Sequence, residues 1–568
     1  MKTVELHLPV GDLPPPGEDD SQLVAAAAFA CGVAVTAVAG VRVRRRSLDA
    51  RRRNHRPASW VVRCDVYLDD EFPPGVDLPT LLRPRRLARP AGDLRPIIVG
   101  MGPAGLFAAL AFADVGVACT LLERGPEVER RNLDVRDLRV HGALQPESNL
   151  CYGEGGAGTY SDGKLYTRSK DPLVREVYER LVALGIDRSV LVEAHPHVGT
   201  NRLIPMMPRL RLALREAGHD LCFDARVDDL VVDDASGGPR VVGVRLADGR
   251  ELIGGPVLLA TGHSARDTYA VLARHGVAMA AKDFAVGTRV EHPQALIDRA
   301  QLGDLAGHPH VGAAEYFVAQ QVASADGVRG VYSFCMCPGG FVLPSPTRLD
   351  HLNVNGMSNA GRGGRFGNAA LVTQVPCDEM YLHEPGDLDD DPEFGVHVAG
   401  GALLGLALQG QLERAAFAAG GGGYRAPAQP LVAFVEGLGA APLATRTSYR
   451  PGVEAFDISA LLPARVVAAL RQGARQIDRR QLRGYLSGEA VVIGVETTTS
   501  SPVRILRGAD RQSVSHAGLF PCAEGAGYAG GIVSSAVDGL RTARTLLAAG
   551  GWLAAGETIA AAPNGKPQ

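Results

Sequence analysis

A glycine-rich turn and one acidic residue follow an apolar segment near residue 100. Gly100, Gly102 and Gly105 have the spacing GxGxxG directly after apolar residues 96–99, and Glu123 comes eighteen residues after Gly105. In this pattern the first glycine makes a tight turn, the second lets the backbone approach a diphosphate, and the third lets a helix pack on a strand. A carboxylate at the end of the next strand accepts both hydroxyls of an adenosine ribose and repels a 2′-phosphate. The stretch therefore predicts a dinucleotide site.

The surrounding residues favour this interpretation over a purely steric glycine turn. A helix is expected over residues 106–113 and a second strand over 118–122, so strand, turn, helix, strand and acid occur in the required order. FAD is favoured over NAD because later segments complete an FAD site. The cofactor contacts predicted in this first segment are Gly100, Gly102, Pro103, Ala104, Gly105, Glu123 and Arg124.

A second glycine-rich loop follows at residues 153–163, with five glycines. Backbone amides and small side chains dominate such a loop, so it can lie flat against a ligand. Lys164 is one of only five lysines in the chain, and a compact ammonium suits a phosphate or a flavin carbonyl. We expect Gly158, Ser161 and Lys164 to contact the cofactor. The alternative is a surface loop without a ligand.

Two later glycine turns complete the predicted cofactor site. A strand expected over residues 251–259 leads into Thr261 and Gly262, and a strand, a glycine turn and a helix recur around Glu524. Glu524 can accept ribityl hydroxyls, and a helix that begins near residue 530 points its positive end at the N1/O2 edge of a flavin, where it stabilises the anionic reduced ring. An ordinary glycine-rich connection is the alternative. The contacts expected from these turns are Thr261, Gly262, Glu524, Gly525, Gly531 and Ile532.

Two closely spaced cysteines, Cys335 and Cys337, precede a Pro-Gly-Gly turn. Residues two apart on a regular strand point to the same face. The pair could therefore exchange electrons with a flavin by thiol chemistry. Two alternatives stay open: the thiols lie near the flavin ring without redox chemistry, or they are buried as small apolar side chains.

Length and composition bound the class of protein. A chain of 568 residues exceeds what one hydrophobic core fills, so two or three domains are expected. The net charge of −3 gives no global field for nucleic acid or an anionic membrane. Nine cysteines, an odd number, argue against a disulfide framework and for a reducing compartment, and no complete set of zinc ligands occurs. We therefore expect a cytoplasmic protein without a metal site.

Residues 1–90 are predicted to form a small N-terminal α+β module. Its uncharged stretch, residues 23–40, is rich in alanine and divides at Gly32 into a helix and a strand, so no membrane span is expected. Eight arginines lie between Arg42 and Arg56 against one acid, Asp49. This segment could bind RNA, which gives an alternative function as an RNA-associated flavoprotein. A solvated hairpin is favoured because no aromatic residues interleave with the arginines to stack on bases.

These segments predict an α/β fold class in three parts. A Rossmann-like FAD-binding domain is expected to be discontinuous, with residues 94–290 and 486–555. A mixed α+β substrate domain at 291–485 is inserted into it. The N-terminal α+β module precedes these domains, and a tail at 556–568 follows them.

Six sequence blocks in a fixed order resemble a known family. They are GMGPAG with its glutamate, NLCYGEGGAGTYSDGKL, YSFCMCPGG, NGMSNAGR, ETTTSSPVRI and CAEGAGYAGGI, over roughly residues 95–545. They are similar to the uncharacterised FAD-dependent dehydrogenases among the glutathione-reductase-like, two-dinucleotide-fold flavoproteins. The resemblance implies FAD, a two-domain architecture and oxidoreductase chemistry, but no substrate. In that family the position of Thr498 is more usually arginine, and Arg504 is the nearby candidate for an anion-binding role.

The sequence thus predicts an FAD-dependent oxidoreductase that passes hydride through flavin N5, with a small-molecule substrate. No separate NAD-binding fold is recognisable, so NAD(P)H is expected only as a transient electron donor at the flavin. A flavoprotein scaffold or sensor without turnover is a further alternative. The candidate catalytic residues are Cys335, Cys337 and Arg504.

Overall fold

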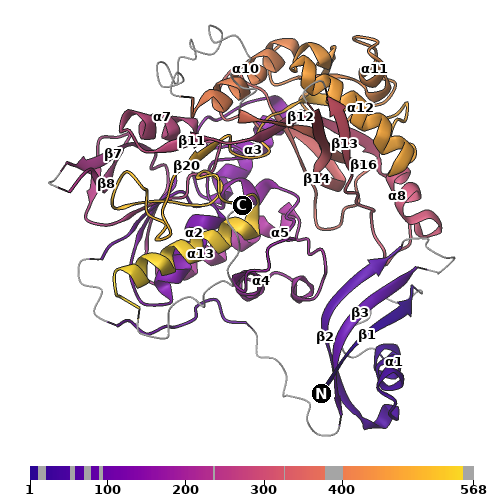
Figure 1. Cartoon of the computed structure of the whole chain (residues 1–568), viewed down its shortest axis with the longest axis horizontal. Helices are drawn as coiled ribbons and strands as arrows, with labels where there is room; N and C mark the ends of the chain where they lie inside the picture. The colour runs from indigo at the N-terminus through magenta and orange to yellow at the C-terminus, as the bar shows by residue number, and fades with distance from the viewer. Residues whose placement is uncertain are drawn as a thin grey trace.

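The computed structural model describes residues 1–10, 21–50, 58–68, 79–88, 94–234, 237–324, 327–377 and 401–553. A small N-terminal module projects from a larger main body (Figure 1). In the module, β1 (Lys2–Pro9), β3 (Ser59–Leu68) and β2 (Val38–Asp49) pair antiparallel in that order, and α1 (Ser21–Cys31) packs on them. Gly32 adopts φ +69° directly after α1, so the chain turns there from helix towards strand.

A five-stranded parallel sheet forms one half of the main body. Its order is β21 (Leu519–Pro521), β10 (Val257–Leu259), β4 (Ile97–Val99), β5 (Thr120–Leu122) and β6 (Asp220–Cys222). α2 (Pro103–Ala113) follows β4 and packs along α13 (Ile532–Ala549), which follows β21 (Figure 1). A Cβ on Gly539 would lie 2.0 Å from the carbonyl oxygen of Ala104, so the two helices approach closely. This is the Rossmann-like arrangement that the glycine motif predicts.

The hairpin after β6 is divided differently from the prediction. β7 (Val227–Asp233), β8 (Arg240–Leu246) and β9 (Glu251–Ile253) form their own antiparallel sheet, so the strand predicted over residues 251–259 is two strands in two sheets. Gly254 adopts φ +124°, and a Cβ on Gly255 would lie 1.8 Å from the carbonyl oxygen of Arg95. The two glycines therefore break the strand and press it against the start of β4.

A large mixed sheet forms the other half. Its order is β13 (Ala319–Ser324), β14 (Gly327–Pro344), β16 (Phe366–Val375), β12 (Phe284–Pro293), β19 (Val491–Glu496), β17 (Ala426–Pro430) and β18 (Val453–Ala455), and β15 (Val354–Met357) pairs with β14. All of these pairings are antiparallel except that of β17 with β18. α12 (Ala464–Arg480) packs on β13, β14 and β16, and α10 (Leu404–Ala419) contacts β17 and β19.

The membership of this sheet shifts the predicted division of the chain. β12 begins at Phe284 and β19 ends at Glu496, whereas the prediction placed residues 284–290 and 491–496 with the nucleotide-binding part. A short antiparallel pair, β11 (Met279–Ala281) and β20 (Val503–Ile505), lies just outside both strands and joins the two halves. The sequence also predicts a helical part around residues 392–413 in the inserted domain; residues 392–400 lie outside the described residues, and α10 begins at Leu404.

The other helical segments connect these sheets. They are α3 (Val128–His141), η3 (Gly156–Tyr160), α4 (Leu173–Ala183), η4 (Arg188–Leu191), α5 (Thr200–Leu203), η5 (Ile204–Met206), α6 (Met207–Glu216), α7 (Arg266–Arg274), α8 (Gln294–Leu302), η6 (Gly303–Leu305), α11 (Leu431–Glu436) and η9 (Ile458–Ala460), with η1 (Val35–Ala37) in the module. Among the described residues, no helix is both long and apolar enough to cross a membrane.

Candidate functional site

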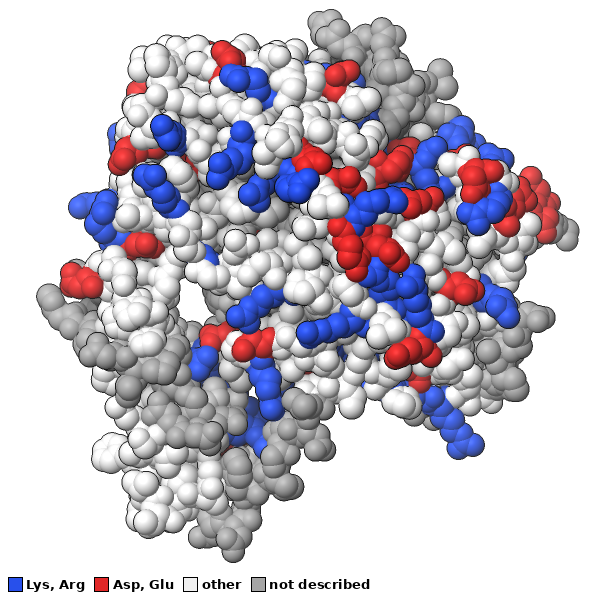
Figure 2. Space-filling model, turned by 180° about the vertical axis from the view of Figure 1, so that it is seen from behind, with Lys and Arg blue, Asp and Glu red and all other residues white. Residues whose placement is uncertain are grey.

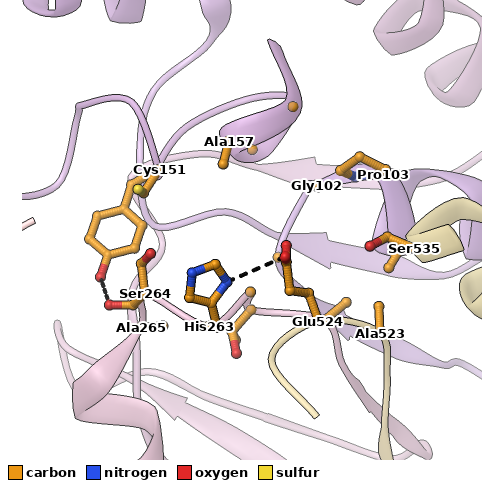
Figure 3. Close-up of a pocket in the computed structure, with 18 of the residues that line it drawn as sticks. Gly102, Pro103, Cys151, Ala157, His263, Ser264, Ala265, Ala523, Glu524 and Ser535 are labelled. Carbon is orange, nitrogen blue, oxygen red and sulfur yellow. Dashed lines mark hydrogen bonds and ion pairs between the residues drawn. The ribbon is translucent and has the colours of Figure 1, made fainter. Parts of the chain in front are cut away.

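A cavity of about 390 Å³ lies at the carboxyl ends of the parallel strands. Residues that directly follow β4, β5, β10 and β21 line it, together with the loop that contains η3 and part of the large sheet. Figure 3 shows His263 and Glu524 near its centre, with Gly102 and Pro103 on one side and Cys151 on the other. In open α/β sheets this edge is where ligands bind.

The glycines of the three turns fall into two groups according to what a side chain would meet. A Cβ on Gly100, Gly105 or Gly525 would lie 2.4, 2.0 or 2.5 Å from a backbone oxygen, so these residues let the turns pack against each other and against the first helix. A Cβ on Gly262 or Gly531 would meet nothing within 4 Å, although both residues line the cavity. The three turns therefore converge, and their cavity-facing glycines leave room for a ligand.

Glu123 stands at the end of β5 with its side chain almost fully buried in the cavity wall. Its Oε1 accepts backbone amides of Gly125 and Gly153 at 3.0 and 2.9 Å. Its Oε2 accepts one amide, that of Met101, at 2.9 Å. Since a carboxylate oxygen has two lone pairs, Oε2 keeps acceptor capacity for a ligand hydroxyl.

Two helices begin at the cavity. Gly102 and Gly531 are the N-cap residues of α2 and α13, and as glycines they supply no side chain to cap the first amides of either helix. Both glycines line the cavity, as do the first helical residues Pro103 and Ile532. The unpaired amides and the positive ends of two helix dipoles are therefore available to an anionic ligand.

His263 and Glu524 come from the turns after β10 and β21. His263 Nε2 lies 3.0 Å from the carbonyl oxygen of Thr498, and its Nδ1 lies 3.6 Å from Glu524 Oε1. Burial alone would lower the pKa of His263, but the Glu524 carboxylate and the Thr498 carbonyl outweigh it, so the pKa is raised above its ordinary value of 6.5. The pair places a switchable positive charge inside the cavity.

The cysteine pair lies where β14 is irregular. Phe334 pairs with Ala370 and Cys337 with Asn368, so β14 has one residue more than β16 over this interval and bulges. Cys335 has φ +45°, a left-handed conformation that is uncommon for a residue other than glycine. The prediction that both cysteines share one face of a regular strand is therefore wrong. Cys335 lines the cavity and is partly exposed, whereas Cys337 is fully buried.

A fully buried arginine, Arg289 on β12, lies against this bulge. Its Nη2 donates to the carbonyl oxygen of Cys335 over 2.6 Å and lies 3.5 Å from Cys337 Sγ. Its Nη1 lies 2.9 Å from each carboxylate oxygen of Glu496. The guanidinium thus fixes the backbone that carries the thiols.

Lys164 and Asp162 approach the same end of the cavity. Lys164 Nζ lies 3.2 Å from Asp162 Oδ2, and His197 Nε2 lies 3.3 Å from Asp162 Oδ1. Burial alone would raise the pKa of Asp162, but His197, Lys164 and Arg362 outweigh it and the pKa is lowered. Apart from its ion pair with Asp162, the Lys164 ammonium donates no hydrogen bond to a described residue. Its N–H groups can therefore donate to a ligand.

Comparison with known proteins identifies the family. The model described as "FAD-dependent protein, C-terminal domain-like" matches residues 283–499, and a domain of unknown function matches residues 2–58. A protein of Clostridium beijerinckii, described as uncharacterized, is 38% identical over 454 residues, which cover 80% of each chain. The chain belongs to a family of FAD-dependent proteins. The matched C-terminal domain contains the whole run from β12 to β19.

Solved structures also resemble the chain. The halogenase PltM is 10% identical with a TM-score of 0.34, and the match covers 81% of this chain and 71% of PltM. CtdE, solved in complex with FAD, is 10% identical with a TM-score of 0.29, and the match covers 79% of this chain and 83% of CtdE. At these TM-scores the likeness carries no inference about activity.

The cavity of this FAD-dependent protein fits the cofactor on its own geometry. Its open glycines and two helix N-termini suit a diphosphate, and the spare acceptor capacity of Glu123 suits a ribose. Fourteen of the predicted cofactor contacts line it: Gly100, Gly102, Pro103, Ala104, Glu123, Arg124, Gly158, Ser161, Lys164, Thr261, Gly262, Glu524, Gly531 and Ile532.

Four predicted residues are not among the described residues that line the cavity. Gly105 and Gly525 pack against backbone oxygens of the turns. Cys337 lies next to Cys335, with its Sγ hydrogen-bonded to the Cys335 carbonyl oxygen. Arg504 lies on β20 with its guanidinium 5.2 Å from the centre of the Tyr528 ring. The structure therefore does not bring Arg504 to the site.

Sequence reasoning missed three residues of the site: His263, Arg289 and Asp162. His263 directly follows the Thr261-Gly262 turn, which could have drawn attention to it. Arg289 is a lone arginine in a strand whose first nine residues are all buried, and a buried charge needs a partner. Asp162 lies two residues before Lys164, but only the fold shows that the two are paired.

Two of the described arginines of the N-terminal module form ion pairs with acids. Arg44 pairs with Asp65, and Arg46 pairs with Glu193 of the main body. Arg46 also pairs through its backbone: its amide donates to Val192 over 2.7 Å, and its carbonyl accepts from Ala194 over 2.9 Å. Residues 51–57, with the other four arginines of this segment, lie outside the described residues. Figure 2 shows basic and acidic side chains interspersed on the visible face of the main body.

Proposed function

We propose that this protein is an FAD-dependent oxidoreductase that passes hydride through flavin N5 between a reduced donor and a small-molecule substrate. The observation that supports it most is the continuity of the cavity. Its lining includes the Gly102 turn, His263 and Glu524, and also Cys335 and Lys164. A site for a dinucleotide and a set of chemically active side chains therefore share one space.

Different residues of the cavity bind different parts of FAD. Glu123 takes the adenosine ribose, the start of α2 takes the diphosphate, and Glu524 takes ribityl hydroxyls. The start of α13 supplies a positive field that favours an anionic reduced ring. When bound, FAD supplies two-electron exchange at N5.

The large sheet serves as the substrate domain in this proposal. It contributes Phe334, Cys335 and Asn355 to the cavity wall. The described residues contain one parallel sheet with a glycine turn, so NAD(P)H acts as a transient donor at the flavin. No disulfide joins the cysteines of the described residues, which suits a reducing compartment such as the cytoplasm.

The spectrum of the purified full chain tests the proposal. We expect yellow protein whose flavin absorption bleaches when NADH or NADPH is added without oxygen. Glu216→Gln, an exposed change on α6, is the matched control and should keep both properties. Colourless protein that takes up no flavin after incubation with FAD would overturn the proposal.

A further inference from the structure

We propose that Cys335 and Cys337 form a dithiol–disulfide couple that reduces small disulfide substrates at the cavity, with Cys335 as the attacking thiolate and Cys337 as the buried partner. The reduction of this couple rests on the proposed function, because it draws its electrons from the flavin site. The attack on a disulfide does not, because it needs only the two thiols.

The two thiols differ in access but lie close together. Cys335 is partly exposed to the cavity, and Cys337 is fully buried. Cys337 Sγ donates to the carbonyl oxygen of Cys335 over 3.3 Å, so the buried thiol lies against the residue that carries the accessible one. A substrate can therefore reach the sulfur of Cys335, whereas the sulfur of Cys337 is buried next to it.

The surroundings favour charge on the accessible thiol. The hydrogen bond from Cys337 lowers the pKa of Cys335, and the cations Lys164 and Arg289 lower it further against the effects of burial and Asp162. Burial raises the pKa of Cys337 above its ordinary value of 9.0. A low-pKa accessible thiol beside a high-pKa buried one is the asymmetry that thiol–disulfide exchange requires.

The backbone holds Cys335 in a conformation that it would not adopt unaided. Its φ of +45° in the β14 bulge is unfavourable for a residue with a side chain, so the surrounding structure must stabilise it. Arg289 does so by binding the Cys335 carbonyl, while Glu496 and Asn368 hold the guanidinium from the other side. Such strain is concentrated at functional sites.

The entrance indicates what kind of disulfide fits. Tyr166 and Phe334 line the cavity yet are 48% and 40% exposed, so two aromatic rings border the opening. Lys164 lines the same space and retains hydrogen-bonding capacity. Aromatic walls and an ammonium suit a small organic disulfide that carries a carboxylate.

The exchange balances in two steps. The Cys335 thiolate attacks one sulfur of the substrate: a Cys335–sulfur bond forms, the substrate S–S bond breaks, and the first thiolate leaves and takes up a proton. Cys337 then loses its proton and attacks Cys335 Sγ, which forms the Cys335–Cys337 disulfide and releases the second thiol. Restoring the dithiol takes two electrons and two protons, which a hydride donor of the reduced-nicotinamide class supplies by way of bound FAD.

Stoichiometric oxidation of the full chain tests the couple without any turnover. The probe is dithiobis(nitrobenzoate), an aromatic disulfide with carboxylates that releases a coloured thiolate. We expect the fast phase to release two thiolates per chain and to leave Cys335 and Cys337 joined, as mapped by mass spectrometry of peptides. Cys337→Ser should release one thiolate and keep the other on Cys335, and Cys335→Ser should lose the fast phase.

Three further variants keep the result interpretable. Cys31→Ser removes a partly exposed thiol of the N-terminal module and should leave the fast phase unchanged. Lys164→Met should slow the fast phase about tenfold, since it removes a cation that stabilises the thiolate, and Lys164→Arg should restore much of the rate.

The outcomes separate this inference from the proposed function. Yellow protein that NAD(P)H bleaches, but whose Cys335 and Cys337 never become joined, overturns the couple and leaves the oxidoreductase standing. A joined pair in protein that binds no flavin supports the exchange step and overturns the electron source. A mixed disulfide between wild-type Cys335 and one half of the probe that persists overturns the role of Cys337.

Discussion

His263 and Glu524 face each other inside the cavity, with Nδ1 of the histidine 3.6 Å from Oε1 of the glutamate (Figure 3). They are far apart in the chain and follow two adjacent parallel strands, β10 and β21. The distance between the two side chains therefore depends on how the two turns are placed. The pair also sets the charge at the middle of the cavity.

Glu524→Gln should make the stability of the protein less dependent on pH. The folded pKa of His263 is raised, so its contribution is fully present below pH 6.5 and is lost as pH rises through the folded value. We expect the variant to lose about 1 kcal/mol of unfolding free energy below pH 6.5 and almost nothing at alkaline pH. Urea unfolding over a pH series measures this, and a difference that grows with pH would contradict it.

Gly102→Ala should weaken FAD binding with little effect on stability, whereas Gly105→Ala should destabilise the fold. A Cβ on Gly102 meets only Gly156 Cα, at 3.9 Å, so the fold should tolerate it within about 0.5 kcal/mol while FAD affinity falls about tenfold. A Cβ on Gly105 would lie 2.0 Å from the Gly100 carbonyl oxygen, which should cost about 1–3 kcal/mol of stability. Calorimetric titration with FAD and thermal unfolding of the apoprotein separate the two. Equal destabilisation by both changes would refute the distinction.

Arg289→Met should be strongly destabilising because it leaves Glu496 as an unpaired buried carboxylate. We expect a loss of about 3–5 kcal/mol in unfolding free energy. The double change Arg289→Met with Glu496→Met should recover most of it, since two apolar side chains then replace the pair. Denaturant unfolding of the four members of this cycle checks the coupling, and additive losses would show that the pair does not act as a unit.

Arg46→Ala should loosen the N-terminal module from the main body. The Arg46 side chain pairs with Glu193 and is 12% exposed, so its loss should cost about 1–2 kcal/mol of docking while the backbone pairing to residues 192–194 remains. Limited proteolysis near residue 50 should then speed up several-fold. Arg63→Ala, an exposed change on β3, is the control and should leave the cleavage rate unaltered.

The nucleotide half was predictable because its signals are local. A strand, the Gly100 turn, a helix and Glu123 follow one another within thirty residues, and the structure places them as expected. The break at Gly254 and Gly255 was not predictable, because Gly255 lies against the backbone of Arg95, which precedes another strand. The unlike placement of Cys335 and Cys337 likewise needs the pairing of β14 with β16, which strand alternation alone does not contain.

The place where the large sheet joins the rest of the chain has a consequence for how such proteins diversify. Its entering strand, β12, and its leaving strand, β19, are hydrogen-bonded neighbours. The chain between them therefore leaves and returns at one pair of adjacent strands. Residues of this segment can be added, removed or exchanged while the ends of the nucleotide-binding half stay where they are. New ligands can thus be recruited by altering one half of the molecule, with the nucleotide-binding half inherited unchanged.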